Sequence, residues 1–411
     1  MLDKVISKAK NLGFSAELFY VKRREFSIRI ERQYSSKDLF EEGYGLRVFK
    51  EGKMGFAFST RPSESLIENA ISSWKVSEED EANQIPLPSK VNYLPLAKEF
   101  DLREVTLKYV ETLRELYESV NVITIHSEAY ESTVGLVNTE GLQVEERRKG
   151  ISVVVMANNK EGTNVSPEIV EYKSFRDPST DVGDLIEEVK AKVDVTKNRE
   201  KIKGKVDALI LTPKAVAELV FPLLSHAVSR ENQFRGKSPL RQGMQVNEGL
   251  KVVDDPTLQD SLYSRSFDGE GQGSRINVVI DKKVKGFLSN WFWALKSKSE
   301  HTASASRSYL TTPGISPSNL VIEHKDLLES RENYLVVDQV QGVHTSNFDT
   351  GEFSVTAPVA WFSKDMKGVR DVIITGNLVD LLRGIEAEGK KRKLVDNVMS
   401  GDLLIRGLHV S

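Results

Sequence analysis

The chain has 411 residues, a net charge of −3 at pH 7 and no cysteine. This length predicts two or three domains, and 39% apolar with 28% charged residues is the composition of a soluble globular protein. Without cysteine there is no disulfide, no thiolate nucleophile and no cysteine-ligated metal. The slightly negative net charge does not favour nucleic-acid binding, which needs a basic surface. No apolar run suits a signal peptide or a membrane span, so we expect a cytoplasmic protein.

Hydrophobic patterning predicts an α+β fold in three units. Small α+β domains are expected over 1–80 and 101–200, and a larger, mainly β domain over 205–411. Residues 78–100 are rich in proline and charge and predict a linker. In the first unit we expect a helix over 2–12, strands over 16–20 and 26–31, a hairpin over 43–60 and a helix over 63–73. In the second we expect a helix over 102–117, strands over 122–130, 133–137, 142–157 and 169–174, and a helix over 182–193. In the third we expect a strand over 206–212, a helix from 213, strands over 275–280, 283–288, 319–323, 334–340, 352–362 and 369–375, a helix over 379–387, and a strand over 402–410.

The hairpin over 43–60 is the clearest β signal of the first unit. Two β-rich runs flank Lys50-Glu-Gly-Lys53, and glycine is favoured in such turns. Gly43 and Gly45, just before it, indicate tightly packed backbone.

The helix from residue 213 has clear start signals. Thr212 is a suitable N-cap, Pro213 suits the first helical position, and apolar residues then follow the helical period to Ala227. Pro222 removes one backbone hydrogen bond and is expected to kink the helix.

The end of this helix carries three polar residues of interest. Ser225 and His226 are neighbours that point about 100° apart on a helix, so they do not form a catalytic dyad. His226 and Arg230 are expected to share a helical face, on which a lone histidine is more often structural than catalytic.

Two other patterns resemble ligand sites only superficially. The glycine run Phe267–Ser274 precedes a predicted strand and not a helix, so it predicts a structural loop and not a dinucleotide site. His126 and Glu128 alternate on one strand face, but no third ligand is evident, and solvent-facing positions are favoured over a metal site. No compact group of carboxylates suggests magnesium or calcium.

A polar loop over 342–355 separates two predicted strands and carries two glycines. His344, Asn347 and Ser354 offer hydrogen bonds to a peptide backbone. The same pattern also suits a turn closed by its own side chains.

Six motifs are spread in order along nearly the whole chain. They are Gly43-Tyr-Gly-Leu-Arg-Val48 with Gly55-Phe-Ala57, Asn138-Thr-Glu-Gly141, Leu223-Leu-Ser-His-Ala-Val-Ser-Arg230, Phe267-Asp-Gly-Glu-Gly271, Gln341-Gly-Val-His-Thr345 with Thr350-Gly-Glu-Phe-Ser-Val355, and Thr375-Gly-Asn-Leu378. Each motif is weak alone, but together, in this order and at these spacings, they are specific. They resemble the motifs of the TldD/PmbA family, whose members form the TldD/TldE peptidase.

In the catalytic branch of that family, a helix carries His-Glu-x-x-x-His and a cysteine near the C-terminus completes a metal site. The resemblance places Ser225 at the first histidine, His226 at the glutamate and Arg230 at the second histidine, and this chain has no cysteine. A fixed positive charge at a ligand position opposes a bound cation. The resemblance therefore implies the non-catalytic PmbA/TldE-like branch, with no catalytic residue and no metal in this chain, and zinc only in a partner subunit.

The implied assembly is a heterodimer with a TldD-like catalytic subunit, or a homodimer, whose chamber takes unfolded peptides. Neither nucleic acid nor a membrane is an expected partner. A β-rich domain with an exposed strand edge suits an extended peptide. Two alternatives stay open: an active hydrolase with a site rebuilt around His226, Glu231 or His344, and a stand-alone homodimeric peptide-binding or scaffold protein.

Overall fold

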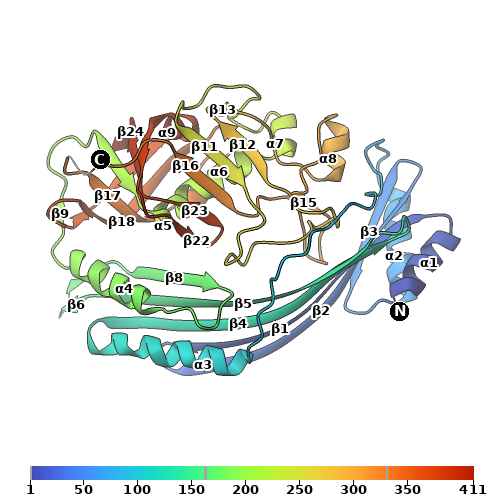
Figure 1. The fold of residues 1–411 in the computed structure, drawn as a ribbon, viewed down its shortest axis with the longest axis horizontal. Coiled ribbons are helices and arrows are strands. Elements are labelled where there is room, and N and C mark those ends of the chain that lie inside the picture. The colour runs from blue at the N-terminus through green and yellow to red at the C-terminus, as the bar shows by residue number, and fades with distance from the viewer. Residues whose placement is uncertain (1, 162–163, 330–331) are drawn as a thin grey trace.

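The computed structural model of the protein describes residues 2–161, 164–329 and 332–411. Helices and strands are mixed, which confirms the predicted α+β class. Figure 1 shows a long curved sheet from the N-terminal half lying beneath a C-terminal half that contains two further large sheets. Within the described ranges, no helix has both the length and the apolar character needed to cross a membrane.

The first sheet has the strand order β3-β2-β1-β4-β5-β8, with antiparallel neighbours throughout. It joins the ranges 1–80 and 101–200 directly, because β1 pairs with β4. Its strands are β1 (Ser15–Ile30), β2 (Tyr34–Lys50), β3 (Lys53–Ser59), β4 (Asn121–Asn138), β5 (Gln143–Asn158) and β8 (Ile169–Phe175). The other elements of this half are α1 (Leu2–Asn11), α2 (Glu64–Val76), α3 (Leu102–Leu113) with a 3-10 turn (Arg114–Glu118), the antiparallel pair β6 (Lys160–Glu161) and β7 (Asn164–Val165), α4 (Gly183–Val195) and β9 (Glu200–Lys201).

Side-chain alternation along β1 explains how this sheet is covered. Leu18 belongs to a core with α1 and α2, and Ile28 belongs to a core with α3 and α4. Both are even-numbered and therefore share one face. Phe19 points to the opposite face and packs with Phe267 and Tyr309 of the C-terminal half. Helices thus cover one face of the sheet, and the C-terminal half covers part of the other.

β1 is one strand where the sequence predicted two. The charged stretch between them continues the strand because neighbouring strands supply acidic partners: Lys22 pairs with Glu42 at 3.2 Å, and Arg24 with Asp38 at 3.0 Å. The predicted hairpin is confirmed. Glu51 and Gly52, between β2 and β3, both have positive φ, as the favoured two-residue hairpin turn requires.

The C-terminal half places the predicted helix from residue 213 inside its core. Leu219, Leu223 and Ala227 are fully buried among residues from both large sheets and from α9. One sheet has, in order of neighbouring strands, β21 (Ile385–Glu388), β24 (Leu403–Arg406), β10 (Ala208–Leu211), β17 (Leu335–Gln341), β18 (Glu352–Phe362), β20 (Ile373–Asn377) and β25 (His409–Val410). The other has, in the same sense, β13 (Lys283–Val284), β12 (Asn277–Asp281), β11 (Leu250–Asp254), β16 (Leu320–His324), β23 (Val398–Ser400) and β22 (Lys393–Val395). The remaining elements are α5 (Pro213–Ala215), α6 (Phe221–Ala227), α7 (Arg230–Phe234), α8 (Trp291–Lys296), β14 (Ala305–Ser306), β15 (Gly314–Ile315), a 3-10 turn (Val343–Thr345), β19 (Val369–Arg370) and α9 (Leu378–Gly384).

Two predicted elements of this half differ from the structure. The strand expected over 283–288 ends at Val284, because the amide of Lys285 turns back to donate to the carbonyl of Val279 at 2.8 Å. The helix expected over 379–387 ends at Gly384, and the chain continues as β21.

A buried charge network ties the first sheet to the C-terminal half. Glu17 on β1 lies opposite Arg47 on β2 and accepts two hydrogen bonds from its guanidinium, at 3.0 and 2.9 Å. Arg47 also donates to Glu270 at 3.1 Å, and Arg307 pairs with Glu17 at 2.8 Å. All four side chains are at most 6% exposed. Close by, an added Cβ at Gly43 would lie 2.4 Å from the Tyr309 ring, which agrees with the tight packing that the sequence indicated there.

Replacing Gly55 with alanine is expected to lower the free energy of unfolding by about 1 to 3 kcal/mol. The added Cβ would lie 2.1 Å from the carbonyl oxygen of Ala70 and 2.5 Å from the amide of Trp74, so β3 and α2 must separate. Chemical denaturation measures the loss. Gly286→Ala is the matched control, because nothing lies within 4 Å of its added Cβ. Equal losses in both variants would contradict the steric argument.

Candidate functional site

The helix that carries Ser225 and His226 begins as predicted. The side chain of Thr212 accepts a hydrogen bond from the amide of Ala215 at 3.3 Å, and Pro213 is the first helical residue. A π-helical turn over Val216–Val220 then precedes α6, and Pro222 lies in the first turn of α6. A π turn re-routes the backbone bonds just where proline has no N–H to donate, so Pro222 is accommodated by a local widening of the helix.

The expected shared face of His226 and Arg230 is wrong, because the helix ends between them. α6 stops at Ala227, and Arg230 begins the separate helix α7. Backbone bonds to a neighbouring segment cause the break: Leu288 donates to Val228, and the amide of Arg230 donates to Leu288, both at 2.8 Å. Sequence periodicity cannot report such a competing partner from elsewhere in the chain.

His226 is already engaged in hydrogen bonds. Its Nε2 lies 2.9 Å from the carbonyl oxygen of Lys237 and 3.0 Å from Oδ1 of Asp349. Since both neighbours are acceptors, Nε2 carries the proton. Zinc in proteins is bound by imidazole, thiolate or carboxylate groups. Ser225, His226 and Arg230 instead supply a hydroxyl, an engaged N–H and a cation on another helix, so these positions do not fit a zinc ligand set.

The structure brings the polar loop over 342–355 against this helix. Besides the Asp349 contact, Phe348 packs on the His226 ring with centroids 5.7 Å apart. Asn347 closes a turn, since its Oδ1 accepts from the amide of Thr350 at 3.3 Å. His344 is exposed on a 3-10 turn and Ser354 is exposed on β18. The three side chains proposed to contact peptide therefore lie on the exposed side of a loop that is locally self-capped.

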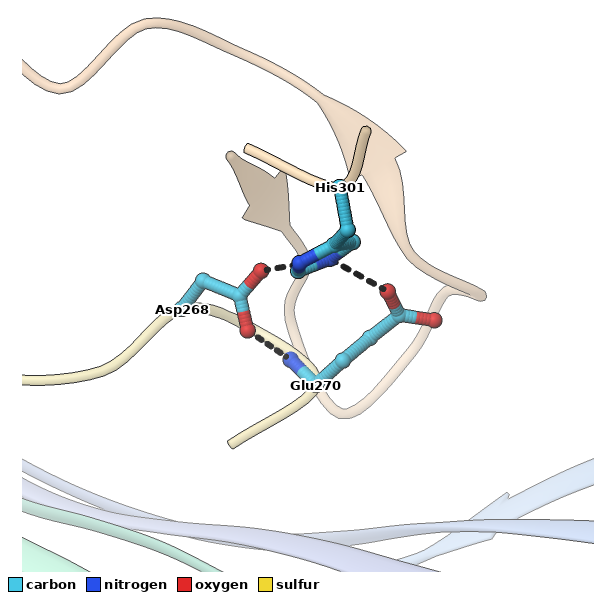
Figure 2. A group of neighbouring side chains, drawn as sticks. All are labelled: Asp268, Glu270 and His301. Atoms are coloured by element: carbon cyan, nitrogen blue, oxygen red, sulfur yellow. Dashed lines mark hydrogen bonds and ion pairs between the residues drawn. The ribbon is translucent and has the colours of Figure 1, made fainter. Parts of the chain in front are cut away.

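A cluster that the sequence did not reveal lies in the glycine loop. Asp268, Glu270 and His301 bring one ligand atom each within 4.8 Å of the others (Figure 2). Nε2 of His301 is 3.7 Å from Oδ2 of Asp268 and 3.9 Å from Oε2 of Glu270. Both carboxylates are buried. The sequence did not suggest this group, because His301 lies far along the chain from Asp268 and Glu270.

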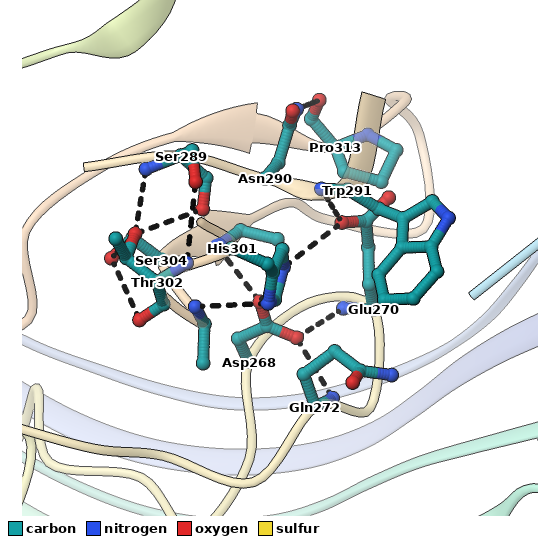
Figure 3. A network of polar contacts seen from close by, with 12 residues as sticks. Asp268, Glu270, Gln272, Ser289, Asn290, Trp291, His301, Thr302, Ser304 and Pro313 are labelled. Atoms are coloured by element: carbon teal, nitrogen blue, oxygen red, sulfur yellow. Dashed lines mark hydrogen bonds and ion pairs between the residues drawn. The ribbon is translucent and has the colours of Figure 1, made fainter. Parts of the chain in front are cut away.

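Hydrogen bonding to the other ring nitrogen shows that this cluster does not fit a metal. Nδ1 of His301 accepts from the amide of Ala303 at 3.2 Å, so the proton of the neutral ring is on Nε2. The His301 ring lies between Asp268 and Glu270, and its Nε2 faces their carboxylates (Figure 3). Burial lowers the pKa of His301 to about 4, which keeps the ring neutral near pH 7. A metal on Nε2 would require the opposite tautomer, with an N–H directed at a backbone N–H.

The carboxylates of the cluster instead hold three segments together. Asp268 accepts from the amides of Glu270 and Gln272 on one oxygen, at 2.8 and 3.0 Å, and from Ala305 on the other, at 3.0 Å. Glu270 accepts from the amide of Trp291 at 2.7 Å, at the start of α8. Burial raises the pKa of both carboxyls. The predicted structural role of the glycine loop agrees with these contacts.

His126 and Glu128 share a face of β4, as expected, but they are only partly exposed. Their side-chain atoms lie 3.8 Å apart, and Glu128 is paired with Arg23 at 3.0 Å. Both side chains are about a quarter exposed, at 24% and 27%. Among the residues described, no third ligand joins them in a metal-binding group.

A cavity of about 470 Å³ between the two halves is bordered by a buried cluster of charges. Lys192 lies 2.7 Å from Glu171 and 2.9 Å from Asp338, and Lys214 lies 3.2 Å from Glu171. Although burial raises the pKa of Asp338, the two lysines outweigh it and hold the pKa below its usual range. Two buried cations thus balance two buried carboxylates.

Glu218, on the π turn, is a third acid beside this balanced set. It lies 3.8 Å from Lys214 and accepts from the amide of Val340 at 2.6 Å. Burial raises the pKa of Glu218 to about 7, with Lys214 opposing the shift. The group therefore gains or loses its proton close to neutral pH, about two helical turns before Ser225.

Known proteins resemble the chain along its whole length. An uncharacterized protein of Methanocaldococcus jannaschii is 28% identical over 95% of this chain and 96% of its own length. The zinc metalloprotease TldD homologue of Saccharolobus solfataricus is 23% identical over 94% and 91%. The crystal structure of TldE from Thermococcus kodakarensis matches with a TM-score of 0.88 at 24% identity, over 100% of this chain and 99% of that one, and shows the same fold.

Sequence models of the family match two parts of the chain. The PmbA/TldA metallopeptidase C-terminal domain matches residues 203–411, and PmbA/TldA metallopeptidase domain 1 matches residues 16–73. The first match alone covers more than half of the chain and includes α6, the glycine loop and the polar loop. The chain belongs to the TldD/PmbA family of metallopeptidases.

Proposed function

We propose that this chain is the non-catalytic, metal-free subunit of a TldD/TldE-type metallopeptidase complex and forms part of the chamber that holds unfolded peptides. The observation that carries the proposal is Arg230, a half-buried cation at a position where the family's catalytic branch has a metal-binding histidine. The break after α6 adds to it, because Ser225, His226 and Arg230 do not lie on one helix. Zinc and the general base belong to a TldD-like partner in the cytoplasm.

The role of this chain in the proposed complex is to shape a wall and not to perform a chemical step. His226 is held by Asp349 and Lys237, so it is positioned to fix the polar loop against the helix. His344 on that fixed loop and Ser354 on the adjoining strand β18 then face outward, where they can hydrogen-bond a peptide backbone, and Asn347 can add its side-chain NH2 while its oxygen caps the turn.

Purification of the chain alone and with a TldD-like subunit that carries an intact His-Glu-x-x-x-His helix tests the proposal. We expect the isolated chain to hold far less than one zinc per subunit and to cleave no unfolded peptide, whereas the mixture forms a heterodimer with chelator-sensitive cleavage. Stoichiometric zinc with chelator-sensitive cleavage by the isolated chain would overturn the proposal. Metal-independent cleavage that disappears in His226→Ala would instead establish a rebuilt hydrolase. A stable homodimer that ignores the TldD-like subunit would establish a stand-alone protein.

A further inference from the structure

A cavity of about 430 Å³ lies beside the start of α7. Its lining carries three cationic side chains, Arg230, Arg275 and Lys285, but only one carboxylate, Glu300. A volume of this size suits a small ligand or one residue of a larger one. The charges of the lining favour an anion.

Arg230 is the half-buried cation of this cavity, and no ion pair compensates it among the described residues. Its guanidinium stacks over the Phe287 ring at 5.0 Å, and one terminal nitrogen donates to Gln233 at 3.1 Å. Its Nε is buried without a hydrogen-bond partner, and within the described part of the chain no carboxylate forms an ion pair with Arg230. Burial lowers the pKa of Arg230, and no neighbouring acid opposes the shift.

A half-buried guanidinium with one hydrogen bond and no ion pair disfavours the folded chain, because Gln233 and the Phe287 ring replace only part of the hydration that it loses. Proteins keep such local conflicts mainly where a ligand resolves them. Stacking on Phe287 fixes the plane of the guanidinium, and a planar guanidinium matches the two oxygens of a carboxylate.

We propose that this cavity binds the carboxylate of a peptide's C-terminal residue, with Arg230 as the principal contact. Exposed Arg275 and Lys285 at the cavity add attraction for the negative charge. Arg230, whose positive charge opposes a metal cation, thus binds an anion. The inference rests on the proposed function for the identity of the ligand as a peptide.

The apolar part of the wall favours a peptide end over inorganic phosphate. Ile276 and Val278 line the cavity and are 56% and 41% exposed, so they offer unpartnered apolar surface to the side chain of a terminal residue. Phosphate sites are typically built from several convergent backbone N–H groups at a longer helix or a glycine-rich loop. Here the lining combines a stacked arginine and two exposed cations with apolar side chains. A carboxylate on an apolar C-terminal residue matches both the charges and the apolar surface.

Calorimetric binding of a short N-acetylated peptide with a C-terminal leucine to the isolated full chain tests the proposal. We expect the free acid to bind about ten- to a hundredfold more tightly than the C-terminal amide, because the amide cannot form the charge-assisted contact. Arg230→Met should remove this preference, and Arg230→Lys should keep part of it. Inorganic phosphate should compete less well than N-acetylleucine.

Arg241→Met is the matched control, since Arg241 is an exposed arginine that does not line the cavity. It should retain the preference for the acid. Thermal unfolding checks each variant, and Arg230→Met is expected to melt no lower than wild type, because it removes an unpaired buried charge. Should the methionine variant fail to fold, Arg230→Gln replaces it.

Equal binding of acid and amide, an unchanged preference in Arg230→Met, or stronger competition by phosphate would each overturn the carboxylate site. Zinc content and reconstituted cleavage address the proposed function separately. A chain that lacks zinc, completes the peptidase and still binds acid and amide equally would keep the proposed function and reject the carboxylate site.

Discussion

Replacing Arg47 with methionine is expected to lower the free energy of unfolding by about 3 to 5 kcal/mol, the typical loss when one partner of a buried ion pair is removed. Arg47 is 6% exposed and lies between Glu17 and Glu270. Without it, Glu270 keeps only neutral hydrogen-bond donors, and Glu17 keeps Arg307 alone. The loss therefore comes from buried carboxylates left without compensation, and not from lost side-chain volume, which methionine largely preserves.

Denaturation with guanidinium chloride, followed by tryptophan fluorescence, measures this effect. Arg24→Met is the control, because Arg24 is paired with Asp38 at the surface and 56% of its side chain is exposed. Exposed pairs contribute little, so its midpoint should stay close to that of wild type. Similar shifts in the two variants would show that the network is not what holds the first sheet to the C-terminal half.

The second large effect depends on pH and concerns Glu218. Burial raises the pKa of Glu218 to about 7 from an ordinary value of 4.5. Between these values the folded chain holds a proton that the unfolded chain has released, so stability falls as pH rises through this range and levels off above about 7. This difference in pKa corresponds to a loss of about 3 kcal/mol in the free energy of unfolding once the pH is above 7. Glutamine cannot ionise but still accepts from the Val340 amide, so Glu218→Gln should be the more stable protein at pH 8.

Thermal unfolding of wild type and Glu218→Gln at pH 5 and pH 8 checks the prediction. The two melting temperatures should be close at pH 5 and diverge at pH 8. Glu248→Gln, at a glutamate whose side chain is 76% exposed, should follow wild type at both pH values. A constant offset between wild type and Glu218→Gln would mean that Glu218 does not titrate between folded and unfolded states in this range.

Features that depend on neighbouring residues in the chain were predicted correctly. The cap at Thr212 and the apolar period to Ala227 were confirmed because a buried helix must present apolar residues to both sheets around it. The hairpin at Glu51-Gly52 was confirmed because its turn is set by two residues alone. The α+β class and the family follow from such signals repeated in order along the chain.

Features that depend on distant partners could not be predicted. The break before Arg230 is made by Leu288, and the helix α8 begins where Glu270 accepts from Trp291. To predict the buried network, one must know that Glu17 and Arg47 lie opposite each other. That follows from the pairing register of β1 with β2, and the sequence of either strand alone does not contain it. The anionic preference at Arg230 likewise depends on a cavity formed by residues from separate segments.

The pairing of β1 with both β2 and β4 also affects how the chain folds while it is being synthesised. β2 leaves the ribosome soon after β1, but β4 ends only at Asn138, so one edge of β1 waits for a partner from much later in the chain. Closing that long loop is slow, and an unpaired strand edge invites contact with other chains. The nascent chain is therefore most vulnerable to aggregation, and most dependent on chaperones, before residue 138 has emerged.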